Sequence, residues 1–517
     1  MAGTETRRLS GGHDGCCCMA DIEGKPAGET AGTTTVYSYE DAISQEGSNH
    51  WSATEYNSNN AWNVNFGSGN VNNNNKYNGN VARAVTAYGV LFLPFYLSVA
   101  QAYQDCLKGK MSSPQAVQYM EIARDDLVSL AVELWTGTYK PGTSTCFLVK
   151  YPKLREVFAA AFRDRIVHHW VCLRLEPLFE ERFESQGNVS FNCRKGYGTD
   201  AAVQHLAEGM KMVSGCYRKD AWVFRGDLVG FFMSINKDLL WYLLERFIVR
   251  WRKRYGREGW QRISYDILAR LGMSGMPEMY WDILLRTTQV IVMHHPEKDC
   301  VLNSPAELWG GLAQNKSLFG CDTGEPIGNL TTQLFANFLM SFFDMLVLFI
   351  FRRYDIATYG TGWYYERFVD DFDVKCEDKD FLLQAIPKME AFLRDKLKLE
   401  LHTDKRYLQE VSHGMLFVGT YVKPGRLYLS NRTRARMMER CNGFRKLMEE
   451  KDELNVLDCQ RIEQVINSYL GFCKGRETYA FRRQCIEDMG EGFWKHFYVK
   501  GHFESIRTRR RYRGVEI

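Results

Sequence analysis

Two adjacent aspartates, Asp370 and Asp371, stand between two short runs of alternating apolar residues, and this is the most constraining feature of the chain. The stretch reads YYERFVDDFDVK from Tyr364 to Lys375. Apolar residues at every second position predict two β-strands, so the stretch is expected to form a β-hairpin whose tight turn carries both acids. Because aspartate is common in turns, a purely structural hairpin is the alternative if this motif is taken alone.

A third acid, Asp227, closes the strand-like run AWVFRGDL. A strand-end aspartate and an acidic hairpin can bring three carboxylates together on one face of a sheet. Such like charges repel, and they become tolerable when divalent cations lie among them. The pattern therefore indicates a site for two Mg²⁺ ions, or Mn²⁺, of the kind that assists an in-line phosphoryl transfer. Asp373 is left out of the ligand set, because a fourth acid is expected to be solvated or hydrogen-bonded.

Charge is distributed unevenly along the 517 residues. Residues 1–90 carry 5 Lys+Arg and 9 Asp+Glu, a net charge of −4, whereas the remaining 427 residues carry 61 and 53, a net charge of +8. The stretch RTRRRYR, from Arg507 to Arg513, has five arginines in seven residues. A basic body with a basic end favours a polyanionic partner, and a solvated charged end is the alternative.

The cysteines and the apolar runs bear on location. Fifteen cysteines are scattered through the chain without a recognisable signal peptide, which indicates free thiols in a reducing cytoplasm. The most apolar run, Gly89 to Ala100, contains Pro94. It is shorter than the roughly 20 residues needed to cross a bilayer. We therefore expect a cytoplasmic protein with no membrane partner.

These residues also carry a family resemblance. FVDD, with Phe368 in the tyrosine position, resembles the YxDD box of reverse transcriptases. The other family blocks follow in the family's order over about residues 90–480: KLREVFAAAFRDRIVHH resembles the fingers block, FNCRKGYGT the block with a basic residue and paired glycines, RGDLVGFFMSI motif A, GEPIGNLTTQLFANF motif B, LELHTDKRYL motif D, HGMLFVGTYV the primer grip and INSYLGFCKG the thumb helix.

The resemblance implies an α+β fold of the right-hand polymerase type, with fingers, a palm built on a small antiparallel sheet, and a helical thumb. The expected organisation is a disordered N-terminus at 1–36, an Asn-rich segment at 37–86, fingers at 87–218, palm at 219–425, thumb at 426–490 and a basic C-terminal tail at 491–517.

Carried over position by position, the resemblance implies roles for individual residues. The metal ligands would be Asp227, Asp370, Asp371 and the Leu228 carbonyl, and Lys405 would protonate the leaving pyrophosphate. Phe232 matches the steric gate that selects deoxynucleotides, a core phenylalanine being the alternative. Arg155 matches a fingers cation that contacts the triphosphate, with a surface salt bridge as its alternative. The implied nucleotide-binding set is Lys153, Arg155, Gly230, Phe231, Phe232, Ile327, Gly328 and Gln333, and the implied template and primer contacts are Arg194, Phe417 and Gly419.

Motif B narrows the type of reverse transcriptase. Most relatives have Gln-Gly followed by Ser-Pro, whereas this chain has Ile327-Gly328 followed by Thr332-Gln333. This form resembles the enzymes of diversity-generating retroelements, which misread template adenines. An aliphatic side chain cannot hydrogen-bond the nascent base pair, which weakens discrimination by about 1–2 kcal/mol. A retron, abortive-infection or group II intron-like enzyme is the alternative. The implied partners are an RNA template, an RNA/DNA heteroduplex, dNTPs and a small basic accessory protein.

The Asn-rich segment fits the same hypothesis. Twelve of the 24 residues from Asn57 to Asn80 are asparagine, spaced among Trp62, Val64, Phe66 and Val71. In these elements the template repeat lies near the polymerase gene, and its variable adenine-rich codons encode asparagine. Residues of about 50–86 are therefore interpreted as a template repeat in translation. The alternatives are an Asn-rich linker and a lectin-like binding module.

Overall fold

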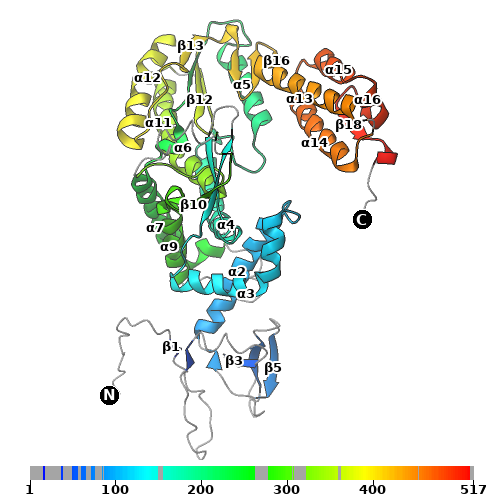
Figure 1. Cartoon of the computed structure of the whole chain (residues 1–517). Coiled ribbons are helices and arrows are strands. Elements are labelled where there is room, and N and C mark those ends of the chain that lie inside the picture. Colours follow the sequence, from blue (N-terminus) through cyan, green and yellow to red (C-terminus); the bar gives the residue numbers. More distant parts are fainter. Residues whose placement is uncertain are drawn as a thin grey trace, which may run out of the picture. The chain divides into compact units, whose positions relative to one another are not determined.

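The computed structural model describes residues 87–149, 155–261, 278–305, 307, 322–358, 362–451 and 453–512, together with short strands between residues 16 and 85. These residues fall into two compact units. The first comprises Met1–Thr145, Ala160–Pro177 and Leu244–Val301, and the second comprises Cys146–Ala159, Leu178–Leu243 and Leu302–Ile517. Both helices and small, mainly antiparallel sheets are present, as the α+β class predicts (Figure 1).

The Asn-rich segment contributes short strands. The sheet order is β5-β4-β3-β6, with antiparallel pairing except between β3 and β6. The strands are β3 (Asn49–Glu55), β4 (Asn60–Asn65), β5 (Val71–Asn75) and β6 (Ala84–Val85), and a separate pair is formed by β1 (Cys16–Cys17) and β2 (Tyr37–Ser38). The predicted disorder of residues 1–36 lies almost wholly outside the described residues.

The first unit has an aromatic core. Its complete helices are α2 (Ala87–Leu107), α3 (Pro114–Thr136) and α9 (Glu278–Met293). Helix α3 begins after Ser113, whose side chain accepts a hydrogen bond from the amide of Ala116, and it ends at Gly137 with φ 78°. A serine cap followed by proline, and a left-handed glycine at the end, are strong local helix signals. Phe95 packs against Trp135 and Trp170, with ring centroids 5.4 and 5.5 Å apart.

Several elements carry residues of both units: α4 (Phe162–Ser185), α7 (Lys237–Gln261), β7 (Ser144–Val149) and β10 (Cys300–Leu302). Strands β7 and β10 form a sheet with β8 (Arg155–Ala159), in the order β10-β7-β8. A short 3-10 turn, η1 (Pro296–Lys298), precedes β10.

The second unit is organised around a four-stranded antiparallel sheet with the order β11-β12-β9-β13. Its strands are β9 (Trp222–Gly226), β11 (Trp363–Phe368), β12 (Asp371–Cys376) and β13 (Tyr407–Glu410). Strands β11 and β12 form the predicted hairpin, in which Phe368 pairs with Asp371, so the hairpin prediction is confirmed.

Helices cover this sheet. Helix α11 (Leu330–Thr358) packs against it through Phe343, whose ring lies 4.8 Å from that of Phe372, and α12 (Lys379–Phe392) lies beside α11 (Figure 1). Helix α5 (Thr199–Val213) packs against β11 and contributes Leu206 and Met210 to a core shared with Val223. The other elements of this part of the unit are α6 (Phe231–Ser234), the π-helical turn η2 (Leu393–Leu397), η3 (Val411–His413) and the three-stranded sheet of β14 (Met415–Phe417), β15 (Thr420–Lys423) and β16 (Arg426–Leu429).

The C-terminal part of the second unit is helical and includes most of the segment that we expected to be a tail. Helices α13 (Asn431–Glu450), α14 (Val456–Cys473), α15 (Tyr479–Glu487) and α16 (Gly490–His496) are followed by the hairpin of β17 (Phe497–Lys500) and β18 (Ser505–Thr508) and by η4 (Arg510–Tyr512). Phe497, Ile506 and Tyr512 lie in the same buried core as α14. The boundary predicted at residue 490 therefore cuts through a folded subdomain, because the apolar residues between the arginines pack onto the helices of the segment that we predicted as the thumb.

Among the described residues, one helix is long and apolar enough to cross a membrane. The window Leu330–Asp355 of α11 meets both criteria, but 72% of it is buried within the protein, the environment of a core helix.

Candidate functional site

The acidic turn is a two-residue β-turn between β11 and β12. Val369 and Asp370 form the turn, and Asp371 is the first residue of β12. Val369 has φ 61°, whereas Asp370 does not have a positive φ. A positive φ at the first turn position suits the twist of a hairpin, but a β-branched residue reaches it only with strain. The turn thus holds Asp370 at the tip of the sheet at a conformational cost.

Asp227 lies at the same end of the sheet. It directly follows β9, and Gly226 pairs with Phe372, the residue after Asp371. A Cβ atom on Gly226 would lie 2.5 Å from the Phe372 ring, so only glycine allows this approach. The structure therefore brings Asp227, Asp370 and Asp371 to one end of neighbouring strands.

Backbone hydrogen bonds hold the segment after β9. The amide of His402 donates to the Asp227 carbonyl at 2.8 Å, and the amide of Val229 donates to the Glu400 carbonyl at 2.9 Å. This bridge pairs Leu228 with Leu401 but uses neither the amide nor the carbonyl of Leu228. The Leu228 carbonyl, a predicted metal ligand, thus accepts no hydrogen bond within this bridge.

The carboxyl groups influence one another electrostatically. Burial and then repulsion from Asp227 raise the pKa of Asp370 to about 6, with a smaller opposing effect from Arg155. Burial also raises the pKa of Asp371, which the hydrogen bond from Arg225 opposes and the charge of Asp227 reinforces. The three acids are therefore close enough to repel, and a nearby cation would stabilise their ionised forms.

Side-chain cations contact two of these acids. Arg225 donates two hydrogen bonds to the carboxylate of Asp371, and Lys405 donates one to that of Asp227. Within the described part of the chain, no three His, Cys, Asp or Glu side chains form a group that could hold a metal ion as they stand. The donor types fit Mg²⁺, which prefers carboxylate and carbonyl oxygen. Each carboxylate oxygen that accepts one of these bonds keeps a second lone pair, which can face an ion.

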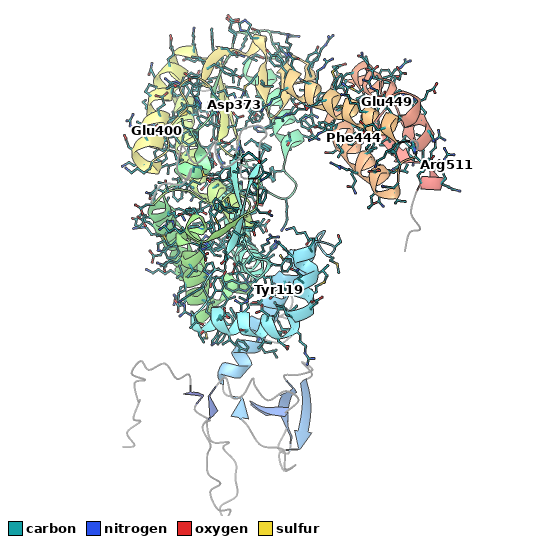
Figure 2. All side chains as sticks on the ribbon, in the orientation of Figure 1. Tyr119, Asp373, Glu400, Phe444, Glu449 and Arg511 are labelled. Carbon is teal, nitrogen blue, oxygen red and sulfur yellow. The ribbon has the colours of Figure 1, made fainter. Side chains whose placement is uncertain are left out.

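Asp373 is hydrogen-bonded rather than solvated. Asp373 lies on β12 of the central sheet (Figure 2). Its carboxyl group is fully buried and accepts a hydrogen bond from Lys375, whose ammonium lies 3.6 Å from Glu366. Burial raises the pKa of Asp373 to about 8 and that of Glu366 to about 7. The Nδ1 atom of His205 also contacts Glu366, while burial lowers the pKa of His205 to about 4, so this contact joins a neutral histidine to a buried carboxyl group.

Arg155 lies close enough to the acids for its charge to act on Asp370, and Phe232 follows Asp227 by five residues in the sequence. Arg155 is the exposed first residue of β8. It forms no ion pair with any residue that the structure describes, so the surface salt bridge that was the alternative interpretation of Arg155 is not observed among those residues. Phe232 is partly exposed on the short helix α6, next to the buried Phe231, with ring centroids 5.2 Å apart. Gly230, with φ 52°, allows the turn into α6. Lys153 lies outside the described residues.

The loop before α11 contains the motif B residues. The Ile327 carbonyl accepts a hydrogen bond from the Phe158 amide at 2.9 Å, and Gly328 has φ 123°. A Cβ atom on Gly328 would lie 2.8 Å from the Phe158 carbonyl oxygen, which explains why a glycine occupies this position. Gln333, on the exposed side of α11, accepts a hydrogen bond from the thiol of Cys193 at 3.1 Å.

Arg194 has a different role from the predicted template contact. Its side chain is buried, and each of its three nitrogens donates a hydrogen bond inside the protein, to Glu180, Asn188 or the Ser190 carbonyl. Its guanidinium also lies 4.1 Å from the centre of the Tyr197 ring. Arg194 therefore stabilises the loop before α5, and its basic residue type alone was a misleading signal.

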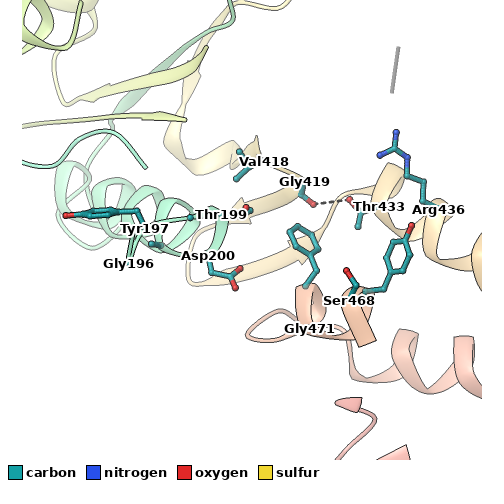
Figure 3. Close-up of a pocket in the computed structure, with 14 residues that line it drawn as sticks. Gly196, Tyr197, Thr199, Asp200, Val418, Gly419, Thr433, Arg436, Ser468 and Gly471 are labelled. Carbon is teal, nitrogen blue, oxygen red and sulfur yellow. Dashed lines mark hydrogen bonds between the residues drawn. The ribbon is translucent and has the colours of Figure 1, made fainter. Parts of the chain in front are cut away.

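Phe417 is likewise a core residue. It is fully buried with the apolar face of α5, so it does not meet a primer directly. Its neighbours Val418 and Gly419 line a cavity of about 910 Å³ (Figure 3). Gly419 has φ 83°, and its carbonyl accepts a hydrogen bond from the Ser430 amide at 3.0 Å. The turn of this hairpin, rather than its phenylalanine, faces the cavity.

The cavity lies between the loop before α5, the β14–β15 turn and the helices α13 and α14. Arg436, Ser468 and Tyr469 supply polar groups to its wall, and the end of the loop with the first turn of α5 contributes Gly196 to Ala201 (Figure 3). Arg476 holds these parts together, because it donates to Asp200 at 2.8 Å and to the Thr420 hydroxyl at 2.8 Å. The motif comparison identified neither Arg436 nor Arg225, because both are ordinary arginines in sequence and gain their positions only in the fold.

Comparisons with known proteins give distant similarities. No family model matches the chain. It is 22% identical over 330 residues to Protein YkfC of Escherichia coli strain K12, an alignment that covers 58% of this chain and 70% of YkfC.

Similar solved structures include two telomerases. The telomerase from Candida albicans, in complex with a fragment of telomeric RNA, has a TM-score of 0.40 and 11% identity, covering 70% of this chain and 56% of that chain. A truncated apo telomerase from Candida tropicalis has a TM-score of 0.38 and 12% identity, covering 56% of this chain and 55% of that chain. The chain thus spans a little over half the length of these telomerase chains.

Proposed function

We propose that the protein is an RNA-directed DNA polymerase that copies an RNA template into cDNA by phosphoryl transfer. The observation that carries this proposal is the meeting of Asp227, Asp370 and Asp371 at one end of the β11-β12-β9-β13 sheet, where Asp227 raises the pKa of both other acids. Arg225 and Lys405 offset part of the negative charge that collects there, and divalent cations would offset the rest.

Two divalent ions, Mg²⁺ or Mn²⁺, would be held by Asp227, Asp370, Asp371 and the Leu228 carbonyl. When bound, such ions stabilise the charge that develops on the transferring phosphoryl group. The carboxylates supply the hard oxygen donors that these ions prefer, and the free Leu228 carbonyl adds a neutral donor to the charged set.

The chain's own residues would place the nucleotide. Arg155 presents an exposed guanidinium close enough to Asp370 to lower the pKa of that carboxyl group. A planar guanidinium suits triphosphate oxygens, which it can bind in pairs. The partly exposed ring of Phe232 would occupy the space of a ribose 2′-hydroxyl, and the exposed ammonium of Lys405 would donate a proton to the leaving group.

The cavity beside the β14–β15 turn would accommodate the nucleic acid. Its wall combines glycine backbone with the guanidinium of Arg436 and the hydroxyls of Thr433, Ser468 and Tyr469. Such groups contact phosphate and sugar rather than base edges, so binding should depend strongly on salt and weakly on sequence.

Within this class we favour the retroelement type that misreads adenine. The supporting features are the aliphatic Ile327 before Gly328 and the Asn-rich segment that precedes the polymerase. A small basic accessory protein and the reducing cytoplasm are further parts of this proposal. Retron, abortive-infection and intron-like enzymes would share the catalytic centre but copy adenine faithfully.

A primer-extension assay with purified protein, an RNA template, dNTPs and Mg²⁺ tests the proposal. We expect template-dependent DNA synthesis that Asp370→Asn abolishes, with elevated misincorporation opposite template adenine that Ile327→Gln reduces. Synthesis with ordinary fidelity at adenine would support the alternative reverse transcriptases. Absence of synthesis by the wild-type protein on all primer types would reject the enzyme class.

The template-repeat interpretation of the segment that contains β3 to β6 can be tested separately. Its backbone forms a sheet, which would also suit a lectin-like module, although about 40 residues bury little core. A near-copy of the coding sequence elsewhere in the genome, differing only at adenines, would establish the template-repeat interpretation. Variable asparagines with codons that match no such copy would leave a protein module.

A further inference from the structure

Arg225 lies on β9, two residues before Asp227, and connects two parts of the site. Its Nε donates to Oδ1 of Asp371 at 2.7 Å, and its Nη2 donates to Oδ2 of the same carboxylate. Its Nη1 donates to a different partner, the Leu416 carbonyl, at 2.5 Å. One side chain therefore joins the acidic end of β12 to the β14–β15 hairpin.

The far end of this connection, the Leu416 carbonyl, directly precedes a buried residue. Leu416 is followed by Phe417, which is fully buried in the core formed with α5, so the Leu416 carbonyl has a defined position. Val418 and Gly419, which come next, line the cavity. The distance from the Asp371 carboxylate to the cavity wall is thus set through a chain of contacts that contains Arg225.

The near end of the connection, where Arg225 meets Asp371, is enclosed by protein. The side chains of Arg225 and Asp371 are each only 18% exposed, and Arg225 faces Asp373 on β12 and Tyr407 on β13 in the strand register. In such surroundings a two-point guanidinium–carboxylate pair fixes orientation as well as charge. Lysine would supply the charge as a single point and could not hold the carboxylate and the carbonyl in one plane.

We propose that Arg225 is a positioning residue that locks the Asp371 carboxylate to the β14–β15 hairpin, so that the acidic centre and the wall of the nucleic-acid cavity keep a fixed spacing. This inference rests on the proposed polymerase function, because the spacing matters only if a primer end must meet the acids. Arg225 acts through Asp371 and Leu416 and does not itself touch the reacting atoms.

Hydrogen exchange of the protein without nucleic acid or metal tests the connection directly. In Arg225→Lys we expect the peptide covering residues 414–423 to exchange at least about fivefold faster, while peptides of α12 keep their wild-type rates. Asp371→Asn should leave this peptide near its wild-type rate, because the bond from Arg225 to the Leu416 carbonyl remains. Arg163→Lys is the matched control: Arg163 makes a two-point contact with Glu133 in the first unit, and its loss should not change exchange of the hairpin.

Steady-state primer extension gives the second readout. A misplaced acid should lower kcat of Arg225→Lys roughly 10- to 100-fold, with KM for dNTP changed by no more than about threefold. A role confined to folding would instead lower the amount of active enzyme, and hydrogen exchange would rise throughout the sheet.

The outcomes separate the two proposals. Unchanged exchange of residues 414–423 in Arg225→Lys, or a uniform increase that includes α12, would overturn the positioning role whatever the wild-type activity. If the wild-type protein never extends a primer, yet Arg225→Lys shows the local increase in exchange, the polymerase function is rejected while the physical connection stands.

Discussion

Lys405 and Asp227 lie 178 positions apart in the sequence, and the Lys405 ammonium donates a hydrogen bond to the Asp227 carboxylate. A turn that follows η2 and precedes β13 brings the lysine to the end of β9. The cation offsets part of the negative charge at the acidic end of the sheet, and in the proposed reaction it would also give a proton to the leaving group.

Replacing Lys405 with arginine separates these two roles. Arginine keeps the positive charge, but it does not release a proton at any ordinary pH. If proton donation matters, Lys405→Arg should lower the single-turnover extension rate by about 10- to 100-fold with little change in nucleotide affinity. Lys451→Arg, in a thumb ion pair with Asp458, is the matched control and should extend normally. Full activity of Lys405→Arg would leave only the charge-balancing role.

Neutralising Asp370 should abolish activity and stabilise the fold. The folded pKa of Asp370 is about 6, above its ordinary value of 3.8, so its ionised form is disfavoured in the folded protein at pH 7. Asp370→Asn removes this cost, which is on the order of 1–3 kcal/mol.

The pH dependence of that gain has a definite sign. Between about pH 6 and pH 4 the folded protein binds a proton at Asp370 that the unfolded chain releases, so acidification stabilises the wild type through this group. The advantage of Asp370→Asn in urea unfolding with EDTA should therefore be largest at pH 7 and shrink towards pH 4. Asp395→Asn, at an exposed aspartate whose pKa the hydrogen bond from Arg394 lowers, should show no such gain. Equal gains at both pH values would contradict the assignment.

Shortening Phe232 should relax sugar selection. Its partly exposed ring on α6 packs beside the buried ring of Phe231, so Phe232→Ala removes surface bulk without opening the core. We expect incorporation of ribonucleotides relative to deoxynucleotides to rise by about 10- to 100-fold, measured with matched ATP and dATP in one template context. Phe232→Tyr should retain selectivity. An unchanged ratio in Phe232→Ala would return Phe232 to the role of a core residue.

Adding a methyl group to Gly328 should destabilise the second unit. At φ 123° the new Cβ atom would lie 2.8 Å from the Phe158 carbonyl oxygen, a rigid backbone atom. Strain and overpacking together should lower the free energy of unfolding by about 2–4 kcal/mol. Gly443→Ala on α13 is the matched control, since a Cβ there meets nothing within 4 Å and should add up to about 1 kcal/mol through helix propensity. Similar unfolding midpoints for the two variants would contradict the geometry.

The β11–β12 hairpin and helix α3 could be predicted from sequence because their signals are local. Alternation around Asp370 and Asp371 depends only on neighbouring residues, and Ser113 and Gly137 mark the two ends of α3 by their own backbone preferences. The C-terminal segment was harder, because its arginines obscured the apolar residues that pack onto the thumb.

By itself the sequence determined which residue types stand at the acidic turn, at the end of β9 and in the loop before α11. Only the tertiary structure decided that Arg194 bonds inward, that Phe417 is buried and that Arg225 joins Asp371 to the Leu416 carbonyl. The physical reason is separation along the chain. A residue's conformational preference acts over a few neighbours, whereas the partner of Arg225 lies 146 positions away and is chosen by strand pairing and burial.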